Sequence, residues 1–202
     1  MKSLFVALAT SAMLFTTAHV SAQKLSLTSG EFSALKDVKD VNVELVYNDP
    51  PVGKFKHESE YLDKKKAEYN KKDDGRGDRW VRAWEEDKQT RFPRKFEDLL
   101  AKYWDDVKVS ADNPKAKYTM ILETTFMEPG FNVYVTRKNA RINGKIKIVE
   151  TADKSKVLVE IDMEDALGRT WGGDDYDTGA RLSECYADAG KAVGQWLTKK
   201  VK

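Results

Sequence analysis

The chain is poor in the side chains that most often build catalytic and metal sites. It contains two histidines and one cysteine, Cys185, among 202 residues. Zinc sites are built from several histidine, cysteine or carboxylate ligands, and nucleophilic dyads and triads most often use histidine as the base. Beyond residue 22, only Cys185 and His57 could form such a dyad, and neither lies in a recognisable motif. The composition therefore favours a non-catalytic protein without a cofactor, although it does not exclude an enzyme.

Other functional signatures are also missing. No phosphate-binding glycine motif or dinucleotide fingerprint follows an expected strand. The 35 basic and 33 acidic residues nearly cancel, so the charge gives no reason to expect nucleic acid as a partner. A pair of carboxylates, as in glycoside hydrolysis, is the catalytic device that remains. No particular pair stands out among the 33 acidic residues.

The only marked apolar run lies at the N-terminus and is too short for a convincing transmembrane helix. Lys2 gives a positive start, residues 5–15 are apolar, and residues 20–22 (VSA) fit a cleavage site. These features are typical of a secretory signal peptide. We expect residues 1–22 to be removed and residues 23–202 to form a single domain. The mature protein is then secreted or periplasmic, and it has no membrane span.

The segment around residues 139–197 predicts the fold better than the rest of the chain. Residues 140–148 and 157–164 both alternate between apolar and polar side chains, which is typical of half-buried strands. A four-residue turn at 152–155 gives a hairpin that pairs Thr151 with Lys156. That register sets opposite charges on one face and branched apolar side chains on the other. The expected pairs are Lys147–Glu160, Lys145–Asp162, Ile148–Val159 and Ile146–Ile161.

The remaining periodicity predicts an α+β fold. Strands are expected at residues 41–47, 117–127 and 131–136, and a break in pairing near 137–139. Helices are expected at 58–72, 80–104 and 178–199, with an interruption near Pro93. We predict a mainly antiparallel β-sheet with helices packed on one face, a two-layer sandwich whose core the C-terminal helix closes.

Aromatic residues supply the candidate binding sites. Phe131, Val133 and Tyr134 follow the turn Glu128-Pro-Gly, and if exposed they would form a partner-binding patch. Trp80 and Trp84 lie one helical turn apart. We interpret them as core residues, because tryptophans along a helix usually pack inward. The alternative is a platform for sugars, with Trp80, Trp84 or Trp171 lining a cleft that holds two carboxylates.

An acidic loop offers a possible calcium site. Asp174, Asp175 and Asp177 lie in a glycine-rich segment, and calcium takes carboxylate oxygens from such turns. The spacing of the EF-hand fails, because the twelfth position from Asp174 is Cys185 instead of a glutamate. The simpler interpretation is that Asp177 or Thr178 caps the last helix, near its positive end.

Four segments resemble an uncharacterised family of secreted proteins from gut-type Bacteroidetes. They are residues 69–72 (YNKK), 75–80 (GRGDRW), 125–132 (TFMEPGFN) and 177–180 (DTGA). The resemblance covers most of the mature chain. It implies a bacterial origin and export, and it assigns no activity and no functional residue.

Two function hypotheses follow. The first is a secreted or periplasmic, non-catalytic binding domain that uses the patch at residues 131–134 or the acidic loop, with a protein or a glycan as partner. The second is a carbohydrate-binding or glycan-cleaving protein that uses tryptophans and paired carboxylates. An open cleft lined by tryptophan would favour the second hypothesis, whereas an exposed apolar patch without a deep polar pocket would favour the first.

Overall fold

The computed structural model describes residues 23–133, 136–168 and 175–201. The predicted signal peptide, Tyr134, Trp171 and Asp174 lie outside these ranges. Six strands form one sheet in the order β1-β8-β7-β4-β2-β3, and two short strands form a separate hairpin. The strands of the main sheet are β1 (Lys24–Gly30), β2 (Asp40–Tyr47), β3 (Lys108–Ser110), β4 (Tyr118–Glu128), β7 (Ala140–Glu150) and β8 (Asp153–Gly168); the hairpin consists of β5 (Phe131–Val133) and β6 (Thr136–Lys138).

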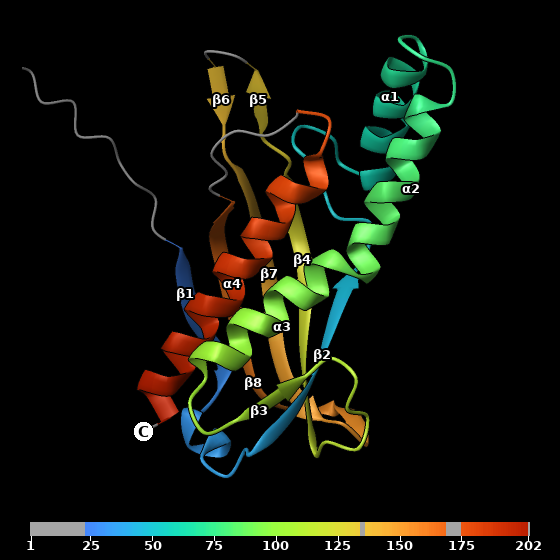
Figure 1. The fold of residues 1–202 in the computed structure, drawn as a ribbon. Helices are drawn as coiled ribbons and strands as arrows, with labels where there is room; N and C mark the ends of the chain where they lie inside the picture. The colour runs from blue at the N-terminus through green and yellow to red at the C-terminus, as the bar shows by residue number, and fades with distance from the viewer. Residues whose placement is uncertain (1–22, 134–135, 169–174, 202) are drawn as a thin grey trace, which may run out of the picture.

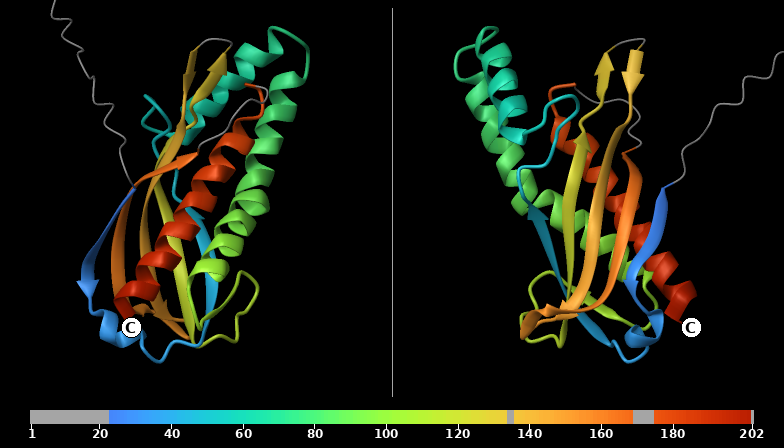
Figure 2. Two further views of the ribbon diagram at one scale, coloured as in Figure 1. Left: turned by 60° about the vertical axis from the view of Figure 1, so that its left-hand side comes forward. Right: turned by 180° about the vertical axis from the view of Figure 1, so that it is seen from behind.

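The helices lie on one side of the sheet, as predicted (Figures 1 and 2). Helices α3 (Arg91–Tyr103) and α4 (Thr178–Val201) cover one face, while α1 (Glu58–Asn70) and α2 (Arg76–Gln89) form a helical hairpin that reaches past the end of the sheet. The predicted α+β fold, closed by its C-terminal helix, is therefore confirmed. Within the described residues, no helix combines the length and apolar character needed to cross a bilayer.

The direction of one central strand was not predicted. Strands β1, β8, β7 and β4 are neighbours in antiparallel order, whereas β2 runs parallel to both β4 and β3. The sheet is therefore mixed. The parallel connection from β2 to β4 is possible because the long helical segment α1–α3 lies between them in sequence and brings the chain back to the same end of the sheet.

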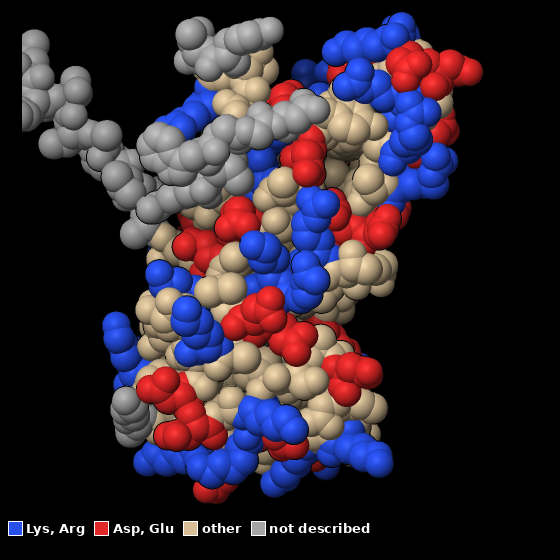
Figure 3. Space-filling model, in the orientation of Figure 1, with Lys and Arg blue, Asp and Glu red and all other residues tan. Residues whose placement is uncertain are grey.

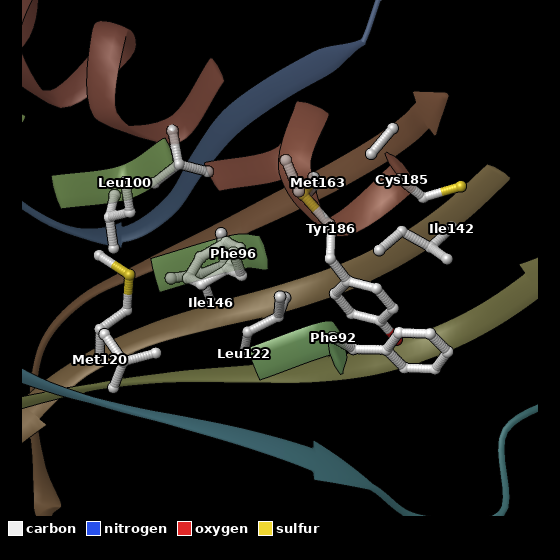
Figure 4. Packing of buried hydrophobic residues seen from close by; sticks show 14 of the residues in the cluster. Phe92, Phe96, Leu100, Met120, Leu122, Ile142, Ile146, Met163, Cys185 and Tyr186 are labelled. Carbon is white, nitrogen blue, oxygen red and sulfur yellow. The ribbon is translucent and has the colours of Figure 1, made fainter. Parts of the chain in front are cut away.

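The core lies between the sheet and helices α3 and α4 (Figure 4). Phe92, Phe96 and Leu100 recur every four residues on α3 and are fully buried. Tyr186 of α4 stacks on Phe92 with ring centroids 4.8 Å apart. Cys185 is buried beside Tyr186, and burial raises the pKa of its thiol, so the side chain remains protonated. His57 is exposed and its Nδ1 is bonded to Asp49, whereas Cys185 is buried, so the two side chains do not form a Cys–His dyad.

The β7–β8 hairpin has the predicted register over its central part. Lys145 pairs with Asp162, Ile146 with Ile161, Lys147 with Glu160 and Ile148 with Val159. The predicted turn at 152–155 is wrong. Two register shifts follow Ile148, and Glu150 then pairs with Asp153 across a two-residue turn. At these bulges β8 contains more residues than the facing part of β7, and the additional residues of β8 stay unpaired. Strand β8 therefore begins at Asp153, two positions before the end of the predicted loop.

Candidate functional site

Strands β5 and β6, here called the arm, extend from one end of the molecule beside the α1–α2 hairpin (Figure 1). Phe131 and Val133 are 38% and 47% exposed, and their alternate positions on β5 place them on one face. Figure 3 shows charged side chains crowded on α1 and α2, whereas the arm carries uncharged side chains together with the basic residues Arg137 and Lys138 of β6. Among the described residues, the only other exposed large apolar side chain is Val157, which belongs to β8. Phe131 and Val133 therefore meet the condition of exposure that sequence analysis set for a partner-binding patch, and partner binding itself stays a prediction.

The arm is fixed at its base by a glycine turn and by the acidic loop. Gly130 has φ +63°, which favours glycine, and its N–H donates to Glu128 Oε1. The backbone N–H of Asn132 donates to Asp175 Oδ1 over 2.8 Å. Asp175 Oδ1 also lies 3.6 Å from a guanidinium nitrogen of Arg181 on α4. Two separate sequence candidates, the apolar patch and the acidic loop, therefore meet at Asp175.

A cavity of about 200 Å³, here called the arm groove, lies at the foot of the arm. Its aromatic lining residues are Phe55, Tyr61, Tyr69 and Phe131. Arg181 also lines it, and this buried guanidinium donates to the carbonyl oxygens of Pro129 and Asp175 and to the Thr178 hydroxyl. Three more charged residues line the groove, and each of them also has a partner within the protein. Lys65 Nζ lies 3.6 Å from Glu68 Oε2, Glu128 accepts a hydrogen bond from Lys138, and Asp175 accepts one from Asn132.

The acidic loop is used inside the protein. Asp177 Oδ1 accepts hydrogen bonds from the N–H of Ala180 at 2.9 Å and from Arg91 at 3.0 Å, so Asp177 caps α4 as predicted. Asp175 faces Asn132 instead. No group of three histidine, cysteine or carboxylate residues suited to a metal occurs in the part of the chain that the structure describes. Asp174 lies outside that part, so calcium binding by this loop stays a prediction.

A second cavity, of about 270 Å³ and here called the indole cavity, lies between α2 and the start of α4. Its residues are Trp80, Ala83, Trp84, Asp87, Arg91, Tyr176, Asp177, Thr178 and Gly179. Trp80 and Trp84 are only 3% and 2% exposed, which confirms that they are core residues. The sugar platform required open indole faces, which Trp80 and Trp84 do not offer; Trp171, the third tryptophan of that hypothesis, lies outside the described residues.

Sequence analysis missed two charged residues of the indole cavity, Asp87 and Arg91. Asp87 follows Trp80 and Trp84 at helical spacing, so these three side chains lie on one stripe of α2. Arg91 is the first residue of α3, which begins directly after the break at Thr90. The sequence signal that could have identified Asp87 is a carboxylate at helical spacing from two tryptophans that are expected to be buried. Asp87 Oδ1 lies 2.9 Å from Arg91 Nε, and Arg91 also binds Asp177. The guanidinium therefore bridges the end of α2 and the cap of α4.

Asp87 is 7% exposed, and this desolvation raises its pKa from 3.8 to about 6, against the opposing effect of Arg91. At pH values between 3.8 and about 6, the Asp87 carboxyl is deprotonated in the unfolded chain but still protonated in the folded chain. Rising pH therefore favours the unfolded state across this window. At 1.36 kcal/mol per unit, the ionised carboxylate costs the folded protein about 3 kcal/mol above pH 6.

The variant Asp87→Asn is therefore expected to be more stable than the wild type at pH 7.5, by up to about 3 kcal/mol. The difference should shrink as the pH falls from 6 toward 4 and vanish well below pH 3.8, where Asp87 is protonated in both states. Urea unfolding at several pH values measures this difference, and Glu86→Gln, at the neighbouring position on α2, is the matched control. Equal stability of Asp87→Asn and wild type at pH 7.5 would contradict the raised pKa.

Comparison with solved structures finds distant likenesses of shape. No protein-family model and no curated protein matches the chain, so the resemblance to secreted proteins of Bacteroidetes stays a prediction. The PelC dodecamer from Paraburkholderia phytofirmans is a solved structure with 9% identity, covering 83% of this chain and 96% of that chain, at a TM-score of 0.37. A variant of that dodecamer in another crystal form gives 10% identity, coverage of 83% and 97%, and the same TM-score of 0.37. Similarity at this level identifies neither a ligand nor a partner for this chain.

Proposed function

We propose that the protein is an exported, non-catalytic binding domain that docks a partner protein on the arm and the arm groove. The observation that carries this proposal is the position of Phe131. Its side chain is exposed on the arm together with Val133, and it also forms one wall of the arm groove. Export rests on the predicted signal peptide.

The chemistry of this end of the molecule favours a protein over a glycan. Exposed apolar side chains that gather in one place mark protein interaction sites, and aromatic residues in pockets carry much of the binding energy at interfaces. A sugar would need several free hydrogen-bonding groups beside an open ring face. The Arg181 guanidinium of the arm groove is already hydrogen-bonded within the protein. An apolar side chain of a partner fits the groove better than a hydroxylated ring.

The double variant Phe131→Ser/Val133→Ser is expected to lose partner binding at least about 30-fold, because truncating a central aromatic contact costs about 2 kcal/mol or more. Its melting temperature should stay close to that of the wild type, since both side chains are exposed. The immobilised protein would capture partners from the envelope and secreted fractions of the producing bacterium, with quantification by mass spectrometry.

Val157→Ser is the matched control, because Val157 is 42% exposed and lies on β8, outside the arm. The proposal requires a protein that the wild type and Val157→Ser capture equally and the arm variant does not. Capture of the same proteins by all three forms would refute it. A second copy of this chain among the captured proteins would identify the partner as self.

A further inference from the structure

Basic side chains gather at the mouth of the arm groove. Two of its aromatic residues, Phe55 and Tyr69, each have cationic groups over the ring, between 5.6 and 5.8 Å from the ring centroid. An aromatic face attracts a cation at this distance and so helps to hold it in place. These cations, here called the basic rim, are Lys54 and Lys64 at Phe55, and Lys65, Lys72 and Arg76 at Tyr69.

The charge of the basic rim is largely uncompensated. An aromatic ring attracts a cation through its quadrupole, but it carries no net charge and neutralises nothing. Glu68 is the one carboxylate among the described residues that pairs with a rim cation, and Lys64 and Lys65 share it. The other rim cations form no ion pair within the part of the chain that the structure describes. Basic and acidic residues nearly cancel over the whole chain, so this positive excess is a local feature.

The acidic residues that line the arm groove do not offset this excess. Glu128 accepts a hydrogen bond from Lys138 of the arm, and Asp175 Oδ1 lies 3.6 Å from a guanidinium nitrogen of Arg181. Each of these carboxylates has a cation of its own, and the rim therefore stays positive. Apolar surface is accessible beside it, because Phe131 is 38% exposed and Phe55 is only partly buried.

We propose that the arm groove and the basic rim bind an acidic segment of the partner protein. An apolar side chain of this segment enters the groove beside Phe131, and flanking Asp or Glu side chains meet the basic rim. The inference rests on the proposed function and adds the chemistry of the partner. Charges of opposite sign at the edge of an interface speed association, and they select against partners of the wrong sign. A basic segment would meet repulsion from the rim.

Peptides from a random library displayed on phage are the probe. They are selected on the immobilised protein at low ionic strength, and those that also bind Phe131→Ser/Val133→Ser are discarded. The remaining peptides depend on the arm, and they are expected to carry Asp or Glu beside an apolar residue and few basic residues. Failure to enrich any arm-dependent peptide would contradict the proposed function itself. Arm-dependent peptides that are neutral or basic would overturn only the acidic segment.

The variant Lys54→Gln/Lys72→Gln removes two exposed cations of the basic rim. Its matched control is Lys108→Gln/Lys115→Gln, since these lysines are also exposed and lie on β3 and in the turn that follows it, at the opposite end of the sheet (Figure 1). By fluorescence anisotropy at low salt, the rim variant is expected to bind the selected peptide about three- to tenfold more weakly than the control. The difference should disappear at about 0.5 M NaCl, because salt screens exposed charges. Both variants should melt at the temperature of the wild type.

An anionic glycan is the other partner that a basic rim can serve, and polygalacturonate tests it. This polymer carries carboxylates but no apolar side chain, so it is expected to displace the selected peptide only weakly. If it binds more tightly than the peptide, and Phe131→Ser/Val133→Ser binds it as well as wild type does, the rim serves a glycan and the proposal is wrong. Equal affinity of the rim variant and its control for the peptide would also overturn the proposal.

Discussion

The variant Gly190→Val is expected to lose about 3 kcal/mol of unfolding free energy and to melt about 6–12 °C below the wild type. Helix α4 crosses α3 at Gly190 without room for a side chain. A Cβ at Gly190 would lie 2.2 Å from the carbonyl oxygen of Phe96 and 3.1 Å from the amide nitrogen of Leu100. Both atoms belong to the backbone of α3, so they cannot move aside unless the helices separate. Separation would open the packed core around Phe96.

Urea unfolding measures this loss, with Gln195→Val as the control. Gln195 lies on the exposed side of α4, so its replacement by valine reports only the lower helix propensity of a β-branched residue, about 0.5 kcal/mol. Gly190→Ala should be destabilised as well, because the first side-chain carbon is already the clashing atom, although alanine regains about 1 kcal/mol of helix propensity. A Gly190→Val protein within about 1 kcal/mol of wild type would show that α3 and α4 can shift apart at little cost.

The parts of the fold that sequence predicted are those in which local pattern and pairing agree. Residues 140–148 and 157–164 permit only one register that puts Lys145 and Lys147 beside acidic residues and keeps isoleucines inside. The direction of β2 could not be read in the same way, because alternation defines the faces of a strand but not the orientation of its neighbour. The position of the turn was predicted wrongly because bulges add unpaired residues to one strand, and nothing in the amino-acid composition of the hairpin marks where they occur.

The candidate site was predictable only where it depends on a single segment. Phe131 and Val133 follow a turn and precede a break in pairing, and both signals are local. The hydrogen bond from Asn132 to Asp175 joins positions 43 residues apart, and no short-range pattern encodes it. Asp87 was missed for a different reason. In a chain with 34% charged residues, one more carboxylate on a helix suggests a solvated face, and only its place in the stripe of Trp80 and Trp84 indicates burial.

The largest single-residue effect on stability is expected for Glu58→Ala, with a loss of about 3–5 kcal/mol. Glu58 is the first residue of α1 and is buried against α2. Its Oε2 lies 2.8 Å from Lys88 Nζ, and its Oε1 accepts the Trp84 indole N–H at 2.7 Å. Burial alone would lower the pKa of Lys88, but its hydrogen bonds to Glu58 and Glu85 raise it, so Lys88 stays charged.

Removal of Glu58 leaves the Trp84 N–H without an acceptor and leaves Lys88 with only Glu85, whose side chain is half exposed. The double variant Glu58→Gln/Lys88→Met should recover most of the lost stability, because the amide oxygen can still accept from Trp84 and no buried charge remains. Urea unfolding of Glu58→Gln, Lys88→Met and the double variant gives the coupling energy of the pair. We expect about 2 kcal/mol or more.

The ion pair between Lys95 and Glu184 is the control for this cycle, since it also joins two helices but its side chains are 37% and 39% exposed. Glu184→Gln should cost less than about 1 kcal/mol. If Glu58→Ala costs no more than Glu184→Gln, burial adds nothing to the Glu58–Lys88 pair.

If the expected difference is found, α1 depends on this pair for its attachment to α2. The Glu58→Ala variant should then also loosen Tyr61 and Tyr69 of the arm groove and Trp84 of the indole cavity. Weaker partner capture by this variant, at temperatures where it is still folded, would show that the arm groove relies on the buried Glu58–Lys88 pair.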